Sequence, residues 1–506
     1  MRVNIKTETE VAQSAIFQGF KKLSKQTFIY GAGVAVTQLA AFVLIPVFTH
    51  VFSPVEYGVI DAISVFFSFA ALFLMMGLDS ATQRFYFDSN DKKERSRVIN
   101  TAFWFLVFIS IVVCSLLFIF SSSISSLIFK TKEYSFVFKI GILSIPFALL
   151  SEFLKGILRI KFAPWRYNFA SFANFFIRVG LSIYLVSILR YGIIGNFYGI
   201  LAGASIALIL TLFFVKNDLK FRFSYFYLKN MLKFGLPLVL AGLGFWALLS
   251  LNRFFFIRFS TLEELGLYSV GSRISNFLLL FIFIFQLSWS PFIMSIYKSN
   301  YFPRLMAKTL IYFVILISFL ALVVSAFSYE IIKIITPLAY IDSYKVIGIL
   351  AIGIIFYAAT PIVGSGISLS KKTYFFSISV FCAALLSVIL NALLIPHFGM
   401  LGAAFGVSAS YFVLVLLYYI FAQKCWPINY EPWKVIKIIF LCCVLIGLSY
   451  LINTGNFLYN VLLKLVIVFS FPISIFFLRI FTRQELDLFK FYLIKSKDVI
   501  VNRLKI

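Results

Sequence analysis

Apolar runs of about 20 residues recur along the whole chain, and each is long enough to cross the hydrocarbon core of a bilayer. Of the 506 residues, 62% are hydrophobic and only 13% are charged, which is too little charge to cover a soluble protein of this size. The pattern predicts an all-α polytopic membrane protein with about fourteen transmembrane helices and no soluble domain between them. The expected spans are residues 28–50, 59–78, 99–120, 136–157, 167–189, 193–215, 234–257, 267–290, 309–327, 346–368, 374–395, 400–421, 435–452 and 457–477.

The 45 Lys and Arg residues are distributed unevenly between alternate connections. If the first span leaves the cytoplasm, 33 of the 45 lie on the cytoplasmic side, with Lys437 in the first turn of its span counted there, 6 lie on the opposite side and 6 lie deeper within spans. This asymmetry follows the positive-inside rule and predicts that both termini are cytoplasmic. The net charge of +26 is then explained by topology and anionic lipid head groups, and no nucleic-acid partner is expected. The six cations on the opposite side are Lys130, Lys132, Arg190, Arg258, Lys333 and Lys345.

The two ends of the chain are expected in the cytoplasm. Residues 1–27 form a polar arm without the cleavage site of a signal peptide. Residues 481–506 carry Lys and Arg among Leu, Phe and Ile, which indicates a basic interfacial helix. The five cysteines form no CxxC pair, and His50 and His397 are far apart in the sequence, so no metal site is predicted.

A short phrase is written twice in this chain. FSPVEYG at residues 52–58 recurs as FSTLEELG at residues 259–266, with an offset of 207 between their first residues. RYGIIG at residues 190–195 recurs as HFGMLG at residues 397–402, and this offset is again 207. The repeated glycines of the second pair predict close packing between helices.

Helix-start chemistry accounts for the residues of the first pair. Ser53 at the N-cap and Glu56 at the third helical position form the pattern of a capping box. Ser260 and Glu263 are expected to form the second box. This chemistry does not account for the common offset, so the spacing requires another explanation.

The common offset predicts an internal duplication of six helices, with a chance coincidence of short motifs as the alternative. Six is an even number, so the two copies share one orientation in the membrane and enclose a substrate site between them. Pro146 and Pro361 are loosely equivalent candidates for helix kinks. The expected organisation is an N-terminal arm (1–27), an N-lobe (28–215), a cytoplasmic linker (216–233), a C-lobe (234–421), two unpaired helices (422–480) and a basic tail (481–506).

Four segments of the chain resemble bacterial polysaccharide flippases of the O-antigen type. They are YGAGVAVTQLAAFVLIPVFTHVFSPVEYGVIDA (30–62), GLDSATQRFYFD (77–88), ELGLYSVGSRIS (264–275) and WSPFIMSIY (289–297). The resemblance implies the multidrug/oligosaccharidyl-lipid/polysaccharide exporter superfamily and its two-lobed fold, as in MATE transporters. It also implies that lipid-linked oligosaccharide units, for example those of lipopolysaccharide, are carried across the bacterial cytoplasmic (inner) membrane.

Cations within spans are the candidates for substrate binding, because a charge inside a bilayer usually faces a cavity or a partner. Arg178, Arg253 and Arg273 map by the repeat offset to uncharged residues, so the fold symmetry does not require them. Three arginines in a cavity suit an anionic passenger such as a lipid pyrophosphate. Asn276 and Lys155 complete the predicted substrate-binding set. The six embedded cations are Lys139, Lys155, Arg178, Arg253, Arg273 and Lys464.

Each candidate also has a structural interpretation. Arg253 is near its helix end and can instead extend to the outer head groups. Lys155 and Glu152 are three residues apart and can form a local ion pair. Asp61 can couple transport to H⁺ or Na⁺, or it can be a first-turn carboxylate that interacts with the helix dipole. Glu152 is the second candidate for ion coupling, and no other cofactor is expected.

Three functions remain compatible with the sequence. The first is a flippase that works by alternating access through a cationic cavity, with a glycan polymerase machinery as its candidate partner. The second is a cation-coupled multidrug exporter of the same superfamily, which would need a carboxylate-rich cavity. The third is a membrane polymerase or ligase, which would need a sizeable catalytic loop that the chain lacks. The chain is therefore predicted to be a transporter and not an enzyme.

Overall fold

The computed structural model describes residues 42–88, 91–297, 299, 301–370, 372–452, 456–478 and 480. Helices are the regular secondary structure throughout these ranges. The expected N-terminal arm, residues 28–41 of the first expected span and the expected basic tail lie outside the described residues. What is described of the first span is the apolar helix Phe42–Val51.

The first copy of the duplication contains seven named helices and one π-helical turn. They are α2 (Pro54–Met75), α3 (Leu78–Asp88), α4 (Lys92–Ile119), α5 (Ser121–Phe129), α6 (Ser135–Ile160), α7 (Pro164–Ile183), the π-helix Tyr184–Ile188 and α8 (Gly192–Val215). The predicted kink residue Pro146 lies inside α6.

The second copy and the two additional helices follow. They are α9 (Tyr225–Ser250), α10 (Asn252–Phe259), α11 (Leu262–Ser275), α12 (Phe277–Ile296), α13 (Phe302–Ala326), α14 (Ser328–Ile335), the 3₁₀ helix Leu338–Ser343, α15 (Tyr344–Val363), α16 (Ser365–Leu369), α17 (Tyr374–Cys425), α18 (Pro432–Leu451) and α19 (Phe457–Phe477). The second predicted kink residue, Pro361, lies in the last turn of α15.

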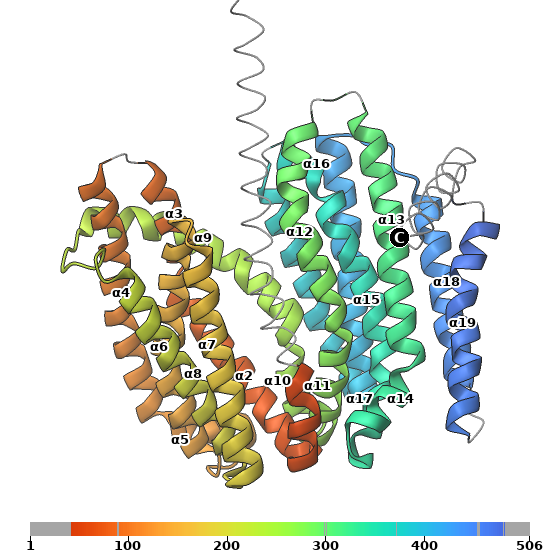
Figure 1. The fold of residues 1–506 in the computed structure, drawn as a ribbon, viewed down its shortest axis with the longest axis horizontal. Helices are drawn as coiled ribbons and strands as arrows, with labels where there is room; N and C mark the ends of the chain where they lie inside the picture. The colour runs from red at the N-terminus through yellow and green to blue at the C-terminus, as the bar shows by residue number, and fades with distance from the viewer. Residues whose placement is uncertain are drawn as a thin grey trace, which may run out of the picture.

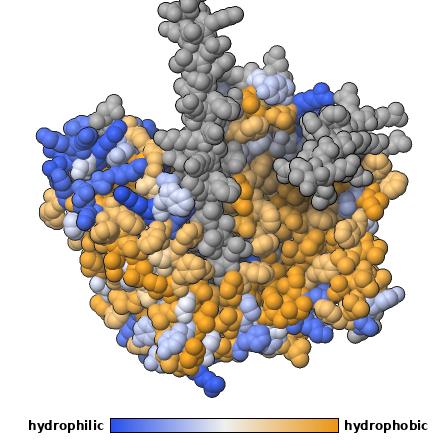
Figure 2. All heavy atoms as spheres, viewed as in Figure 1, coloured by the Kyte–Doolittle hydropathy of each residue, from blue (hydrophilic) through white to orange (hydrophobic). Residues whose placement is uncertain are grey.

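Eleven helices in the described ranges are long and apolar enough to cross a bilayer, and α11 with α12 adds a twelfth candidate that bends by 41°. α17 consists of two helices joined at Gly399, whose φ of +52° and ψ of −127° are not helical, and these two helices cover the expected spans 374–395 and 400–421. The expected total of fourteen stays a prediction, because most of the first span lies outside the described residues. Figure 2 shows hydrophobic residues across the middle of one face and hydrophilic residues at its upper left and lower edges, as a membrane-spanning protein requires.

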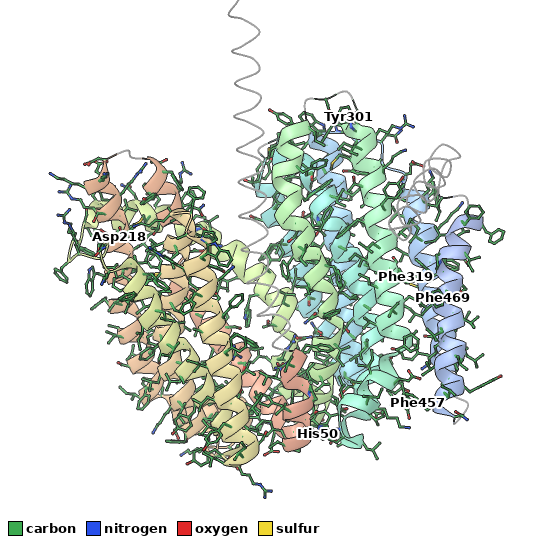
Figure 3. The ribbon with its side chains drawn as sticks, in the orientation of Figure 1. His50, Asp218, Tyr301, Phe319, Phe457 and Phe469 are labelled. Carbon is green, nitrogen blue, oxygen red and sulfur yellow. The ribbon has the colours of Figure 1, made fainter. Side chains whose placement is uncertain are left out.

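The helices form two groups that meet at one end of the molecule. Figure 1 shows α3–α8 on one side and α12–α19 on the other, closest at the lower end and separated at the upper end. His50 lies at the lower end, whereas Asp218 and Tyr301 lie at the upper end (Figure 3). Near the lower end the Tyr340 hydroxyl donates a hydrogen bond to the Phe52 carbonyl at 2.7 Å, which joins the two copies directly.

A tight helical hairpin occurs once in each copy. Its turns contain Gly192 and Gly399, with φ values of +59° and +52°, a region that glycine adopts without strain. Beyond each turn another glycine brings the two helices into contact. A Cβ at Gly195 would lie 3.1 Å from the Cβ of Leu185, and a Cβ at the equivalent Gly402 would lie 2.4 Å from the Leu394 carbonyl oxygen. These contacts confirm that the repeated glycines permit close packing.

The repeated segments 52–58 and 259–266 lie where the two copies touch. They contain the starts of α2 and α11, and these two helices pack on each other. A Cβ at Gly58 would lie 2.2 Å from the Leu262 carbonyl oxygen, and a Cβ at Gly266 would lie 1.9 Å from that of Pro54. The offset of 208 exchanges these two contacts with each other. The contact is therefore self-complementary, as at a two-fold interface between identical subunits.

The first capping box forms as predicted. The second, expected at Ser260 and Glu263, is wrong by one residue. Thr261 is the N-cap and accepts a hydrogen bond from the Glu264 backbone N–H at 3.1 Å. The Glu264 carboxylate instead accepts from the Met400 backbone N–H at 3.1 Å, so it ties the start of α11 to the hairpin turn of α17.

Candidate functional site

The site is built around a buried carboxylate on α2. Asp61 has a side chain that is 11% exposed and faces α10 and α11 of the other copy. Arg253 Nε lies 3.2 Å from Asp61 Oδ2, and Arg273 Nη2 lies 3.5 Å from Oδ1. The Ser269 hydroxyl donates to Asp61 Oδ2 at 2.8 Å. One carboxylate thus connects the two copies through two arginines and a serine, and most of its acceptor capacity is in use.

Arg253 is directed inward, toward Asp61, and not toward the outer head groups. Its Nη1 donates to the Leu249 carbonyl at 2.5 Å and to Asn252 Oδ1 at 2.8 Å. Its guanidinium lies 5.3 Å from the ring centroid of Tyr268, within the range of a cation–π contact. These contacts fix the guanidinium at the junction of the lobes and leave it 11% exposed.

Arg273 is held more loosely, with a side chain that is 25% exposed. Its guanidinium lies 4.9 Å from the ring centroid of Tyr57, and its contact with Asp61 is at the outer limit of a hydrogen bond. The Tyr57 hydroxyl is buried and has no hydrogen-bond partner within the described part of the chain. Arg273 therefore keeps donors that a ligand can use.

Arg178 lies on α7, and its side chain is exposed. Its backbone packs against α8, where a Cβ at Gly199 would lie 2.8 Å from the Arg178 carbonyl oxygen. Its guanidinium interacts electrostatically with that of Arg273 across the two copies. In the described ranges Arg178 has no ion-pair partner. Two like charges within electrostatic range of each other, of which only Arg273 has a carboxylate partner among the described residues, attract an anion.

The structure separates the other candidates from this group. Lys155 is buried on α6, forms an ion pair with the exposed Glu152 and lies 5.8 Å from the Tyr167 ring centroid. The two side chains therefore form the local ion pair that was the structural interpretation of these residues. Asn276 is exposed at the bend between α11 and α12, one turn beyond Arg273. The roles of these residues in binding or coupling stay predictions.

Ser269, Tyr57 and Asn252 were not among the candidates predicted from the sequence. A signal was available for Ser269, because it is separated from Asp61 by 208 residues and so occupies the equivalent position of the second copy. Tyr57 and Asn252 lack such a signal, since aromatic and amide side chains of this kind occur in many spans. Their positions depend on how α2, α10 and α11 pack.

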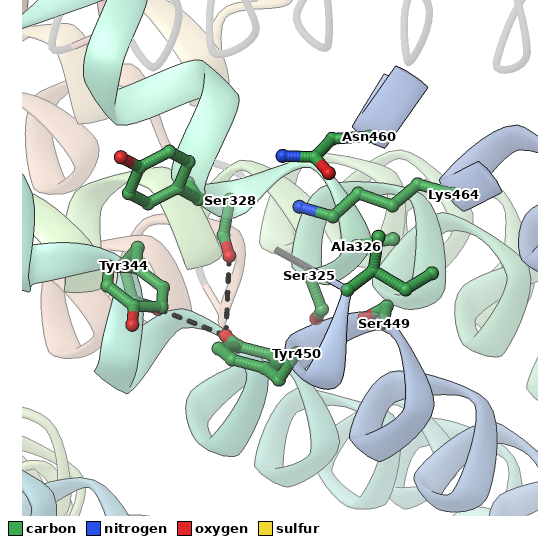
Figure 4. Close-up of a pocket in the computed structure, with 10 residues that line it drawn as sticks. Ser325, Ala326, Ser328, Tyr344, Ser449, Tyr450, Asn460 and Lys464 are labelled. Carbon is green, nitrogen blue, oxygen red and sulfur yellow. Dashed lines mark hydrogen bonds between the residues drawn. The ribbon is translucent and has the colours of Figure 1, made fainter. Parts of the chain in front are cut away.

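A second group of buried charges lies between the C-lobe and the two additional helices. Lys464 on α19 donates to both carboxylate oxygens of Glu330 on α14, at 2.6 and 2.8 Å, and both side chains are at most 5% exposed. Lys464 also lines a pocket of about 60 Å³, where the Tyr450 hydroxyl accepts from Ser328 and donates to the Tyr344 carbonyl (Figure 4). This group does not contact the Asp61 group and is interpreted as a structural clamp.

Comparisons with known proteins agree with this architecture. A family model described as polysaccharide biosynthesis protein matches residues 47–335. A solved structure of the lipid II flippase MurJ in an inward closed conformation covers 89% of this chain and 99% of its own, at 18% identity and a TM-score of 0.72. An inward-facing MATE family multidrug resistance transporter of the MOP superfamily covers 80% and 93%, at 16% identity and a TM-score of 0.56. No curated protein matches the chain.

These similarities establish the fold. The predicted all-α, MATE-like two-lobed architecture is confirmed. At 18% and 16% identity, the lipid II flippase and the multidrug resistance transporter show the fold that this chain shares with them.

Proposed function

The chain belongs to the polysaccharide biosynthesis protein family, and from that premise we propose that it is a flippase for lipid-linked oligosaccharides. The cargo carries a polyprenyl pyrophosphate and crosses the cytoplasmic membrane for assembly of a surface polysaccharide. O-antigen of lipopolysaccharide is one cargo of this class, and a glycan polymerase is the partner that would receive it. The fold shared with a lipid II flippase supports this proposal.

The observation that carries the proposal is the excess of arginine at the junction of the lobes. Arg178, Arg253 and Arg273 contribute three positive charges, and Asp61 compensates only one of them. Guanidinium groups match the oxygens of a pyrophosphate with paired donors, and such contacts strengthen away from bulk water. The exposed Arg178 and the partly exposed Arg273 are the groups that would contact the phosphates first.

Asp61 gives the site a mechanism for alternating access. In the described arrangement the lobes are joined at the His50 end, which the charge distribution predicts to be the outer end. An incoming pyrophosphate competes with Asp61 for Arg273 and weakens a contact between the copies. With two guanidinium neighbours, Asp61 is a poor site for H⁺ or Na⁺. Ion coupling through Asp61 would therefore act only after the lobes have moved apart.

A deletion strain complemented with variants tests this proposal. Arg178→Ala and Arg273→Ala should stop surface glycan assembly and cause lipid-linked precursor to accumulate on the inner side. Arg304→Ala, which removes an exposed arginine outside the site, is the matched control and should restore the glycan. Protein levels in the membrane are measured for each variant. Normal glycan and no precursor accumulation in both site variants would refute the assignment.

The multidrug exporter is the competing function, because MATE transporters share the fold. The charges of the site oppose it, since a cationic drug requires an excess of carboxylates and the site has an excess of arginines. The same deletion strain separates the two functions: increased drug sensitivity with intact glycan would favour the exporter, and lost glycan with normal drug sensitivity the flippase.

A further inference from the structure

A pocket of about 480 Å³ lies between the two copies, lined by residues of α2, α5, α9 and α10. It differs from the Asp61 group in composition, because aromatic and aliphatic side chains form nearly all of its wall. Its volume lies in the range of sites that bind small molecules or lipid chains. The aromatic wall consists of Phe66, Phe69, Trp246 and Phe254.

The aromatic wall is held in place by specific contacts. Trp246 Nε1 donates to the Ser68 hydroxyl at 2.9 Å, which satisfies the polar atom of the indole. The ring centroids of Trp246 and Phe69 are 4.7 Å apart, and those of Trp246 and Phe254 are 6.2 Å apart. A fixed apolar wall of this kind favours a hydrocarbon chain over a polar ligand.

Two exposed cations complete the lining. Lys130 follows α5 in the first copy, and Arg258 lies in α10 of the second copy. Neither forms an ion pair with another of the described residues. They are also two of only six cations assigned by the charge distribution to the outer side. Their position beside an apolar wall suits a ligand that is anionic at one end and apolar at the other.

We propose that this pocket binds an anionic phospholipid from the leaflet on the His50 side. One acyl chain lies on the aromatic wall, and the phosphate lies between Lys130 and Arg258. Because the two cations belong to different copies, a phosphate that contacts both favours the arrangement in which the lobes are joined at this end. The membrane composition then regulates the transporter at a site that is separate from its cargo.

Fluorescence quenching by brominated lipids tests the proposal on the purified, reconstituted full chain. Brominated phosphatidylglycerol and brominated phosphatidylcholine are titrated into the same bilayer, and the Trp246 contribution is obtained by subtracting the signal of Trp246→Phe. We expect the anionic lipid to quench Trp246 at a much lower mole fraction. A cation near an anionic head group contributes about fivefold to binding, so Lys130→Gln with Arg258→Gln should lower the preference by at least tenfold.

A matched double variant provides the control. Arg190→Gln with Lys333→Gln removes two exposed cations of the same predicted side that do not line the pocket, and it should keep the preference. Equal quenching of Trp246 by both lipids, or the same loss of preference in the control, would overturn the proposal. Displacement of phosphatidylglycerol by a lower concentration of polyprenyl phosphate would also overturn it, because the occupant would then be the tail of the cargo.

Discussion

Replacement of Lys464 by methionine should destabilise the folded protein more than removal of any charge from its surface. The variant leaves the Glu330 carboxylate buried at 3% exposure without its two hydrogen bonds. Removal of one partner of a buried ion pair costs about 3–5 kcal/mol, because the remaining charge stays desolvated. The pair also joins α14 to α19, so the loss weakens the attachment of the two additional helices.

Because a pocket lies beside the pair, the two single variants should lose different amounts of stability. Lys464 lines the pocket of about 60 Å³ together with the hydroxyls of Ser325 and Ser449, so water can reach its ammonium group. Glu330 does not line this pocket. We therefore expect Glu330→Met to cost about 2 kcal/mol, less than Lys464→Met, because polar groups and water compensate a lone ammonium.

The double variant Glu330→Met/Lys464→Met completes the cycle. Apolar replacements of both partners of a buried pair are often neutral, so the double variant should be about 2 kcal/mol more stable than Lys464→Met. The free energy of unfolding is measured for all four proteins by steric trapping in bicelles. If both single variants lie within about 0.5 kcal/mol of the wild type, the pair is solvated and the desolvation penalty expected for it does not exist.

Three further changes test other parts of the structure. Asp61→Asn removes the counter-charge of Arg253 and Arg273 and should cost about 2–4 kcal/mol of stability. If Asp61 couples transport, flux in vesicles should also lose its dependence on an imposed ion gradient. An unchanged dependence would exclude that role. Gly266→Val places side-chain atoms in the contact with Pro54 and should prevent accumulation of folded protein in the membrane, whereas normal accumulation would contradict the close approach of α2 and α11. Gly399→Ala forces a residue with a Cβ to adopt a φ of +52° and should cost about 1–3 kcal/mol by thermal denaturation.

The sequence was sufficient for the membrane class and the repeat because both depend on local patterns. Length and apolarity determine which segments cross a bilayer. The 207-residue offset identified the hairpins that contain Gly192 and Gly399 as equivalent parts of the two copies. The second cap could be located only to within one residue, since FSTLEELG offers both Ser260 and Thr261 as N-cap residues. Which of the two acts depends on the backbone path between α10 and α11.

The site could be predicted only in its residue types. Charges inside spans pointed to Arg178, Arg253, Arg273 and Asp61, but hydropathy does not state which side of a helix meets which neighbour. Two of the cations within spans instead form ion pairs away from the Asp61 group: Lys155 pairs with Glu152, and Lys464 pairs with Glu330. The partner of Lys464 was missed because Glu330 lies in a short helix at a span end, where a carboxylate is ordinary.

The contact between α2 and α11 has a consequence for the ancestry of the chain. Gly58 meets Leu262 and Gly266 meets Pro54, so one surface serves on both sides of the contact. A six-helix half that carried this surface would already have been able to pair with a second molecule of itself. Gene fusion then needed no new recognition surface, and each half was afterwards free to diverge, as the arginines found in only one copy illustrate.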